Sequence, residues 1–366
     1  MARSSSLIGF AGTVCLSTAV SISMAVCLSI ALSAAPHDAE CQENTPPATA
    51  SPPASSTAAQ AAKPKKRDTA PRKPEAQPVS LSRYRGWDYL VGRLRERGVE
   101  ERDLVVIYQS PKMPRFSLIQ FNLAPRENPH LYRHFSKPSF SLLGAQFARD
   151  NQPMFDDIES SLKVPREVVS AILVIESGIG KNTGKELVVH RLSRLASVCD
   201  PDNLRHNYIV QKKKDPTVTF EMVRDRCIYL ETTFLPEIPA LIEIGKRTKT
   251  SPLKIRGSSA GAFGLPQFLP SAFIRFGMDG DRNGAVSLYH PSDAAWSAAN
   301  YLSSFGYRDD IPVEEKRAVI WRYNKSDAYI DAVLGLSVAI RAELDAAQEA
   351  AQEAAVTPSA DETPDA

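Results

Sequence analysis

The sequence predicts a mainly α fold, and two observations support that prediction. Apolar residues recur at three- and four-residue steps over most of the chain between residues 80 and 345, which is the spacing of one face of an α-helix. Few stretches alternate apolar and polar residues as a strand does, and the best candidates are 104–108 and 116–121. We therefore expect only minor β elements. The predicted helices cover 87–97, 164–175, 220–246, 294–305 and 328–344.

The composition narrows the class of protein. In 366 residues, 44 Lys and Arg stand against 42 Asp and Glu, which gives a formal net charge of +2, and 43% of the residues are hydrophobic. This hydrophobic fraction allows a buried core. The balanced charge gives no reason to expect a nucleic-acid partner.

The N-terminus predicts an export signal. Arg3 precedes a mostly apolar run over 7–35, which ends in small residues at 31–34 that suit signal peptidase. The run is also long enough to span a bilayer, so an uncleaved inner-membrane anchor is the alternative. Both interpretations predict a protein exported to the periplasm, either free or retained at the inner membrane.

The remaining chain divides into a folded domain and two unfolded flanks. Residues 36–79 are rich in Pro, Ala, Ser and Lys and cannot bury enough apolar surface to fold, so we expect a disordered linker. The folded domain then covers 80–345. The acidic, Pro-containing tail over 346–366 is expected to be disordered as well.

Two cysteines, Cys199 and Cys227, lie within the predicted domain. An exported protein folds in an oxidising compartment, where these two could form a disulfide. Their spacing alone leaves the paired and the free states both open.

The first candidate site is the segment 164–180. Pro165 suits the first turn of a helix, and the residues that follow are apolar around most of the helix, so this helix should be deeply buried. Gly178 and Gly180 end it, which places Glu176 in its last turn. There the negative end of the helix dipole and the loss of solvent both oppose ionisation of a carboxylate. Such a Glu is suited to act as a general acid, although a Glu at a helix end without function is the alternative.

The second candidate site is the segment 257–271, which is rich in Gly, Ala and Ser. Residues this small let a ligand approach the backbone closely. Ser258 and Gln267 offer hydrogen bonds to amide or hydroxyl groups of such a ligand. The alternative is a Gly-rich turn that packs before a helix.

The third candidate site is a loop that begins at Asp279. Asp279, Asp281 and Asn283 follow the D-x-D-x-N-G pattern of a calcium-binding loop, in which alternating oxygen ligands precede a Gly at the turn. His290 stands where the standard loop has its bidentate Glu. An Asx-rich turn without a metal is the alternative.

Taken in order, these segments resemble the lytic transglycosylases, specifically the membrane-bound lytic transglycosylase B family. The resemblance is carried by the Glu-Ser-Gly turn at Glu176 and by a Gly-Ser-x-Ala-Gly-Ala-x-Gly-x-Pro-Gln-Phe-x-Pro-Ser motif over 257–271. A Trp-Arg-Tyr-Asn sequence at 321–324 adds to it, and the segment 293–302 is similar to the family's Asp-Ala-x-x-Ser-x-Ala-Asn-Tyr. The similarity covers about 87 to 344.

The resemblance implies a lysozyme-like, α-rich catalytic domain over 80–345 that cleaves peptidoglycan glycan strands. Glu176 falls on the family's catalytic glutamate, which acts first as acid and then as base. The β-1,4 bond between N-acetylmuramic acid and N-acetylglucosamine is then broken without water, leaving a 1,6-anhydromuramic acid end. By the same resemblance, Ser258, Gln267, Tyr323 and Asn324 bind the substrate.

The resemblance also implies a structural Ca²⁺ in an EF-hand-like loop. That loop is longer than the standard one and is closed by Asp293, while the backbone of Ala285 supplies a carbonyl oxygen. The implied ligands are therefore Asp279, Asp281, Asn283, Ala285 and Asp293.

The sequence departs from the family's pattern at one place. The family usually has an aromatic residue shortly after the catalytic Glu, whereas this chain has Ile179 in the turn. No second catalytic acid is evident, although Asp200, Asp202 and Glu186 could approach the site from loops. The alternatives to a lytic transglycosylase are a hydrolytic muramidase and an inactive scaffold that binds the cell wall. We expect a monomer whose partner is peptidoglycan.

Overall fold

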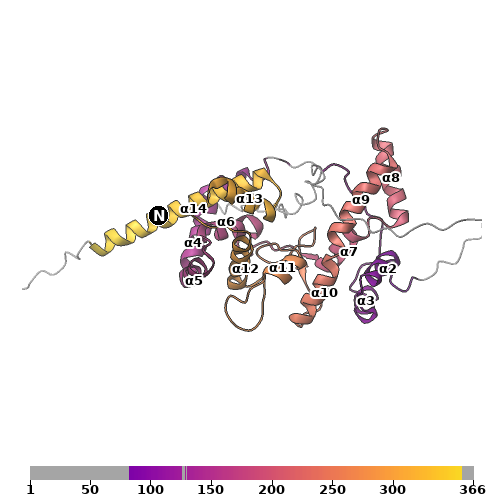
Figure 1. Ribbon diagram of the computed structural model, residues 1–366, viewed down its shortest axis with the longest axis horizontal. Coiled ribbons are helices and arrows are strands. Elements are labelled where there is room, and N and C mark those ends of the chain that lie inside the picture. Colours follow the sequence, from indigo (N-terminus) through magenta and orange to yellow (C-terminus); the bar gives the residue numbers. More distant parts are fainter. Residues whose placement is uncertain (1–81, 126–127, 129, 357–366) are drawn as a thin grey trace, which may run out of the picture. The chain divides into compact units, whose positions relative to one another are not determined.

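The computed structural model describes residues 82–125, 128 and 130–356, and these confirm a mainly helical fold (Figure 1). The predicted signal or anchor, the linker over 36–79, and the end of the tail over 357–366 lie outside the described residues. The chain-order elements are α2 (Asp88–Glu96), α3 (Glu101–Tyr108), η1 (Arg133–Ser136), α4 (Pro138–Asp150), α5 (Gln152–Leu162), α6 (Arg166–Ser177), β1 (Glu186–Leu187), α7 (Val188–Ala196), α8 (Pro201–Lys214), α9 (Phe220–Phe234), α10 (Glu237–Arg247), β2 (Arg256–Gly257), α11 (Pro270–Phe276), α12 (Pro291–Ser304), α13 (Val313–Tyr323) and α14 (Asp327–Val356).

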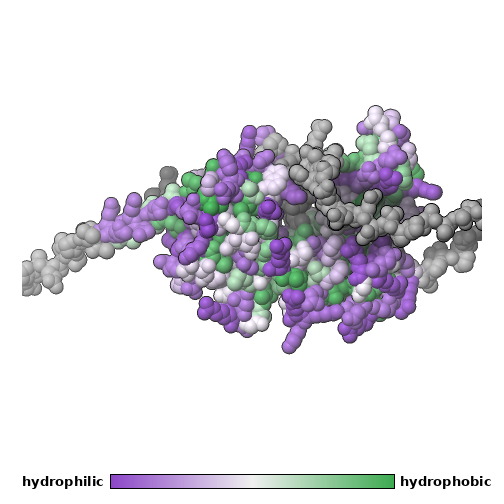
Figure 2. Space-filling model, viewed as in Figure 1, coloured by the Kyte–Doolittle hydropathy of each residue, from purple (hydrophilic) through white to green (hydrophobic). Residues whose placement is uncertain are grey.

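Apolar side chains of the described residues gather in two main clusters. One cluster is built from α2, α3, α7, α9, α10 and α11, and the other from α4, α5, α6, α12, α13 and α14. The segment 257–271 contributes to both, because Phe263 and Phe268 belong to the first cluster and Leu265 to the second. Figure 2 shows hydrophilic residues over most of the visible described surface, with hydrophobic ones in scattered patches.

The packing of α4, α6 and α14 forms the centre of the second cluster (Figure 1). Gly144 of α4 permits a close approach, since a Cβ at this position would lie 2.3 Å from Cδ1 of Ile340 on α14. Val168, Val169, Ile172 and the other apolar residues of α6 are buried, as the sequence predicted. The deep burial of α6 therefore comes from helices that precede and follow it in the chain.

The predicted strand over 104–108 is wrong, because these residues form the second half of α3. The acidic residues Glu101 and Asp103 in its first turn favour a helix N-terminus. Leu104, Ile107 and Tyr108 then point to the core at three- and four-residue spacing. Burial on one face of a helix outweighs the β propensity of the short Leu-Val-Val-Ile-Tyr run.

The predicted strand over 116–121 is also wrong, although its alternating pattern has a structural cause. Ile119 and Phe121 are buried, but their backbone groups pair with side chains of α8 rather than with a strand. The backbone N–H of Ile119 donates to Oδ1 of Asn203 over 2.6 Å, and that of Phe121 donates to Oδ1 of Asn207 over 3.2 Å. Asn207 also donates to the carbonyl oxygen of Ile119 over 2.7 Å.

Two helix boundaries also differ from the predictions. The predicted helix over 220–246 is divided into α9 and α10 at Pro236, since proline lacks the N–H that a continuous helix needs. The predicted disorder of the tail is wrong over 346–356, where α14 continues to Val356. Ala, Glu and Gln dominate this stretch, and their high helix propensity extends the helix.

Cys199 and Cys227 form a disulfide, with their Cα atoms 5.3 Å apart. The bond joins the chain just before α8 to α9. It closes a loop with a sequence separation of 28, which restricts the unfolded chain.

No helix within the described ranges combines the length and the apolar character that a membrane span requires.

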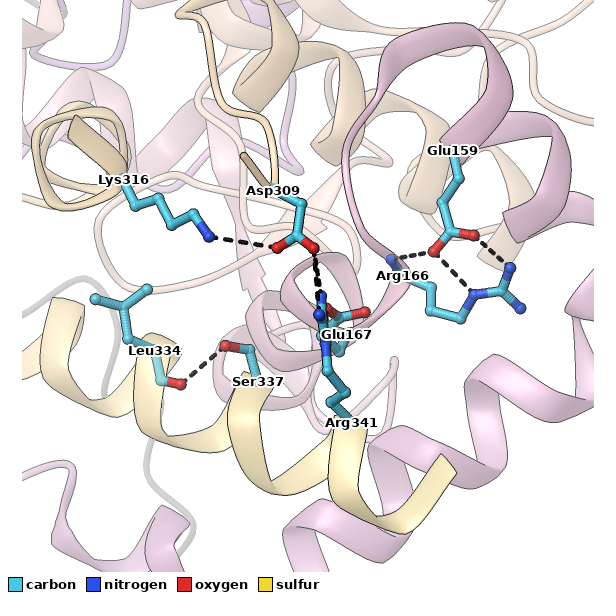
Figure 3. A network of polar contacts seen from close by, with 8 residues as sticks. All are labelled: Glu159, Arg166, Glu167, Asp309, Lys316, Leu334, Ser337 and Arg341. Atoms are coloured by element: carbon cyan, nitrogen blue, oxygen red, sulfur yellow. Dashed lines mark hydrogen bonds and ion pairs between the residues drawn. The ribbon is translucent and has the colours of Figure 1, made fainter. Parts of the chain in front are cut away.

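A network of charged side chains anchors the N-terminal end of α6 (Figure 3). Arg341 of α14 donates from Nε to Oε1 of Glu167 over 2.7 Å, and from Nη2 to Asp309 over 3.1 Å. Lys316 approaches Asp309 to 3.3 Å, and Arg166 pairs with Glu159. All of these residues except Lys316 border a groove of about 1190 Å³. Because its charged groups largely pair with one another, we do not assign this groove as the functional site.

We predict that Arg341→Ala lowers the free energy of unfolding by about 1–3 kcal/mol, because Glu167 is 7% exposed and would lose its main partner. Arg317→Ala is the control, since it removes ion pairs to Asp327 and Asp331 that are mostly exposed. That change should cost at most about 1 kcal/mol. Urea denaturation measures both, and equal losses would contradict the assigned role of Arg341.

Candidate active site

Glu176 lies in the last turn of α6, where the chain leaves the helix through a Schellman motif. The N–H of Gly178 donates to the carbonyl oxygen of Val174 over 2.9 Å, and the N–H of Ile179 donates to that of Leu173 over 3.0 Å. Gly178 has a φ of 58° and Ile179 has a φ of 54°. A β-branched residue is strained in this left-handed region, so the turn after Glu176 is held by its surroundings. Glu176 itself is half-buried.

A buried tyrosine from α14 positions the Glu176 carboxyl group. The hydroxyl of Tyr329 donates to Oε1 of Glu176 over 2.8 Å. Burial and then the charge of Glu176 raise the pKa of Tyr329 well above that of a free tyrosine, so the phenol stays a donor. The ring of Tyr323 stacks on that of Tyr329, with centroids 6.3 Å apart and an interplanar angle of 11°.

Sequence reasoning did not single out Tyr329. It lies in the first turn of α14, at one of many apolar or aromatic positions in that helix. No local pattern distinguishes it from a core residue. Its contact with Glu176 spans a sequence separation of 153 and depends on the packing of α14 against α6.

Glu176, Gln267, Tyr323 and Asn324 border one cavity of about 170 Å³. The remaining lining residues are Phe268, Leu269, Ser271, Ala272, Tyr301 and Arg322. The hydroxyl of Tyr323 donates to the carbonyl oxygen of Pro266 over 2.6 Å, which fixes its ring. Asn324 is 3% exposed, and its Oδ1 is buried without a hydrogen-bond partner among the described residues. Such an acceptor lacks the partner that a buried polar group normally has.

The segment 257–271 forms a tight turn against the loop that follows α6. Gln267 has a φ of 50°, and its Nε2 donates to the carbonyl oxygens of Thr183 and Gly264 over 3.2 and 2.7 Å. Gln267 therefore joins the motif to the loop after Glu176. Ser258 is 2% exposed and is not among the residues that border the cavity. Its Oγ accepts the N–H of Ala262 over 3.2 Å.

Of the described residues that border this cavity, Glu176 is the one acid. The sequence offered Asp200, Asp202 and Glu186 as further acids, and the structure places them elsewhere. Asp200 caps the N-terminus of α8, where its side chain accepts the N–H groups of Asp202 and Asn203. Asp202 and Glu186 are exposed. The residues that border the cavity therefore carry one carboxyl group, two phenols, two amides, one guanidinium group and one aliphatic hydroxyl group.

In the predicted metal loop, the side-chain carboxylates accept hydrogen bonds from the backbone N–H groups of the same loop. Asp293 is fully buried, and its carboxylate accepts the N–H of Gly280 over 2.8 Å and that of Ser287 over 2.7 Å. The carboxylate of Asp279 accepts the N–H groups of residues 283 and 284. One potential ligand atom from each of Asp281, His290 and Asp293 lies within 4.8 Å of the others. The loop thus gathers oxygen donors of the kind that a hard cation prefers.

Ala285 and Asn283 belong to the same loop. The side chain of Asn283 accepts the N–H of Ala285 over 2.9 Å and donates to Asp281 over 2.8 Å. All five predicted metal-binding residues therefore lie in one stretch that leads into α12. His290, which the standard loop would replace with Glu, has its Nδ1 3.4 Å from Oδ2 of Asp281.

The fold and the cavity together define a class of protein. It is a helical domain with a cavity at which, among the described residues, one carboxyl group lies beside hydrogen-bonding side chains. The family model described as the transglycosylase SLT domain matches residues 86–317. The chain belongs to this family. The resemblance predicted from the sequence is thereby confirmed.

The membrane-bound lytic murein transglycosylase B of Escherichia coli (strain K12) is a relative with 27% identity over 144 residues. These residues are 39% of this chain and 32% of that protein, so the match spans about a third of the length of the curated relative.

Two solved structures share the fold. The E. coli lytic transglycosylase Slt35 in complex with calcium matches with a TM-score of 0.52 at 17% identity, over 71% of this chain and 94% of that one. Pseudomonas aeruginosa SltB3 in complex with NAG-anhNAM-pentapeptide matches with a TM-score of 0.52 at 16% identity, over 72% of this chain and 80% of that one. These matches confirm the fold that the sequence predicted.

We predict that Gly184→Ala disrupts the site by separating the loop after α6 from the 257–271 turn. A Cβ at Gly184 would lie 2.1 Å from the carbonyl carbon of Gly257, and the φ of Gly184 is 88°. Gly98→Ala is the control, because Gly98 has a φ of 78° but nothing within 4 Å of the added Cβ. Both changes should cost about 1 kcal/mol for the backbone conformation. Gly184→Ala should cost about 2 kcal/mol more, and equal unfolding free energies would contradict the close approach.

Proposed function

We propose that this chain is a lytic transglycosylase that cleaves the β-1,4 bond between N-acetylmuramic acid and N-acetylglucosamine in peptidoglycan. The observation that carries the proposal is that Glu176 is the one acid among the described residues bordering the cavity. Hydrolytic glycosidases commonly use two carboxyl groups, one as acid and one as nucleophile or base. A reaction that uses a hydroxyl of the substrate itself as nucleophile needs only one.

In the proposed reaction, Glu176 acts twice. Its carboxyl group first gives a proton to the bridging oxygen as the bond from C1 of muramic acid to that oxygen breaks, and the N-acetylglucosamine side leaves as an alcohol. The resulting carboxylate then takes the proton of the muramic acid O6 hydroxyl while O6 forms a bond to C1. The 1,6-anhydro ring results, Glu176 is protonated again, and no water is consumed.

Tyr329 supports both steps from one side of the carboxyl group. Its hydroxyl binds Oε1 and directs the group toward the cavity. A phenol that stays protonated stabilises the carboxylate that forms when Glu176 gives up its proton. We assign Tyr329 as a positioning residue for Glu176.

Sugar binding is assigned to the amide and phenol groups around Glu176. The buried Oδ1 of Asn324 would accept from an N-acetyl N–H or a sugar hydroxyl. The rings of Tyr323 and Tyr301 border the cavity and give the sugar an aromatic surface. Gln267 is assigned to bind the sugar from the 257–271 turn. Ser258 does not border this cavity and is assigned to a neighbouring sugar.

We predict that Glu176→Gln lowers the release of soluble muropeptides from purified sacculi by at least about a hundredfold, because the amide cannot donate the proton. Asp202→Asn removes an exposed acid on α8 and is expected to leave the release unchanged. Chromatography of the soluble fraction measures both. Retention of activity in Glu176→Gln, or an equal loss in Asp202→Asn, would contradict the single-acid assignment.

We propose a structural Ca²⁺ in the loop from Asp279 to Asp293. The side chains of Asp279, Asp281, Asn283 and Asp293 and the carbonyl oxygen of Ala285 are the assigned ligands. Two features support the site. Potential ligand atoms of Asp281 and Asp293 lie within 4.8 Å of each other and of one from His290, and the Asp293 side chain is fully buried. A bound cation would offset the negative charge of that loop and hold the start of α12, which packs against α5 and α6.

We predict that Ca²⁺ added to chelator-treated protein raises its Tm by about 5 °C or more at saturating concentration, because the ion binds the folded loop only. The variant with both Asp279→Asn and Asp281→Asn should show no such rise. Differential scanning calorimetry measures the change directly. The same Tm with Ca²⁺ and with chelator would contradict the site.

Location in the cell envelope follows from the proposed substrate. The apolar run over 7–35 is proposed as the export signal, with an uncleaved inner-membrane anchor as the alternative. The disulfide between Cys199 and Cys227 is consistent with folding in an oxidising compartment. The folded domain is proposed to act as a monomer in the periplasm.

A further inference from the structure

Ser271 carries the one aliphatic hydroxyl group among the described residues that border the cavity of Glu176. It lies in the first turn of α11, at the end of the 257–271 segment. Its backbone N–H donates to Oε2 of Glu237 over 2.8 Å, and its Oγ donates to Oε1 of the same side chain over 2.7 Å. Both oxygen atoms of Glu237 are thus bound by one residue that borders the cavity.

Glu237 is a buried acid that does not itself border the cavity. It lies in the first turn of α10 and is 6% exposed. The buried side chains of Glu167 and Glu231 each pair with an arginine, whereas Glu237 forms no ion pair within the described ranges. A buried charge without a cation is costly unless hydrogen bonds stabilise it. Those that Glu237 accepts come from Ser271.

The surroundings of Glu237 determine which partner donates the proton. Burial raises the pKa of Glu237, and the two hydrogen bonds from Ser271 oppose this shift. The first turn of α10 also favours a negative charge. An ionised carboxyl group can only accept hydrogen bonds, so the hydroxyl proton of Ser271 is used inside the protein. The lone pairs of its Oγ remain for a ligand.

Other polar side chains at the cavity also use their protons within the protein. Nε2 of Gln267 donates to two backbone carbonyl oxygens, and the hydroxyl of Tyr323 donates to a third. Oδ1 of Asn324 is an acceptor without a partner among the described residues. These groups therefore offer a ligand oxygen acceptors, which suit the O–H and N–H donors of an N-acetylated sugar.

We propose that Glu237 is a positioning residue for glycan binding, because it takes the hydroxyl proton of Ser271 and leaves Oγ to accept a hydrogen bond from a sugar hydroxyl. This inference rests on the proposed function. Ser271 contacts the glycan, and Glu237 acts through it. With its proton turned toward the cavity instead, Ser271 would place one donor against another, and the hydrogen bond to the sugar would be lost.

Binding in the Glu176→Gln background tests the proposal without turnover. The probe is a peptide-free tetrasaccharide of alternating N-acetylglucosamine and N-acetylmuramic acid, and isothermal titration calorimetry measures its affinity. Ser271→Ala removes the acceptor and is expected to weaken binding about fivefold. Glu237→Gln is expected to weaken it about tenfold. The glutamine oxygen still accepts the backbone N–H, but its amide donates to Oγ and turns the hydroxyl proton of Ser271 toward the cavity.

A matched control and a double variant separate this role from support of the fold. Glu231→Gln is the same substitution at a glutamate that is also 6% exposed, and it is expected to leave the affinity unchanged. In the Ser271→Ala background, Glu237→Gln should cause no further loss, because Glu237 acts through that hydroxyl group. An additional tenfold loss there would show that Glu237 only supports α11 and would overturn the proposal. An unchanged affinity in Ser271→Ala would overturn it too.

A further variant keeps the test independent of folding. Glu237→Asp retains a group that can only accept, so we expect it to bind the tetrasaccharide more tightly than Glu237→Gln does. The variants' Tm values identify the folded proteins, and the affinities are measured well below them. Weaker binding by folded Glu237→Asp than by folded Glu237→Gln would contradict the proposed role of the proton.

The failure of this inference and that of the proposed function are distinguishable. Muropeptide release depends on Glu176, whereas these affinities are measured with Glu176 replaced. A wild-type protein that releases no muropeptides would reject the proposed function. A protein that releases them, but whose affinity for the tetrasaccharide does not depend on Ser271, would reject the roles of Ser271 and Glu237 alone.

Discussion

The hydrogen bond from Tyr329 to Glu176 is the interaction on which the candidate site depends. It joins the last turn of α6 to the first turn of α14, and both helices pack with α4 in one apolar cluster. Gly144 allows the close contact between α4 and α14. The charged network around Glu167 and Arg341 holds the opposite end of α6. The packing of whole helices therefore positions the carboxyl group of Glu176. The turn that follows Glu176 is strained at Ile179, and the same packing holds this turn in place.

The site is completed by a segment that belongs to both apolar clusters. Phe263 and Phe268 of the 257–271 turn pack in one cluster and Leu265 packs in the other. Gln267 ties the turn to the loop after Glu176. The proposed sugar-binding groups thus lie where the two clusters meet. A Cβ at Gly184 would lie 2.1 Å from the carbonyl carbon of Gly257, and a Cβ at Gly257 would lie 2.0 Å from the carbonyl oxygen of Ala262. This explains why small residues are needed in that turn.

Much of the fold could be predicted from the sequence, and the failures have physical causes. Helical spacing identified α6 and its buried face, since that pattern is local. The run over 104–108 was misassigned because a short apolar stretch fits a strand or a buried helix equally well. The acidic first turn and the burial of one helix face both favour the helix that is observed. The alternation around Ile119 was real, but Asn203 and Asn207 supply the pairing that a second strand would have provided. Such pairing by side chains leaves no periodic signal.

The candidate site was predictable to a similar degree. The residues recognised by motif, Glu176, Gln267, Tyr323 and Asn324, are brought together in one cavity. Ser258 lies outside it, and Tyr329 was missed because only the tertiary packing of α14 brings its hydroxyl to Glu176. The sequence left the pairing of Cys199 with Cys227 open, since the pairing depends on how α8 packs against α9.

The central claim is that one carboxyl group, without a second acid, directs the attack of a substrate hydroxyl rather than of water. The mass of the muropeptides released from purified sacculi tests it most directly, because the 1,6-anhydro product is lighter than the hydrolysis product by one water. The account predicts 1,6-anhydromuramic acid ends from the wild-type protein. Reducing muramic acid ends without anhydro ends would contradict it and would identify a hydrolytic muramidase.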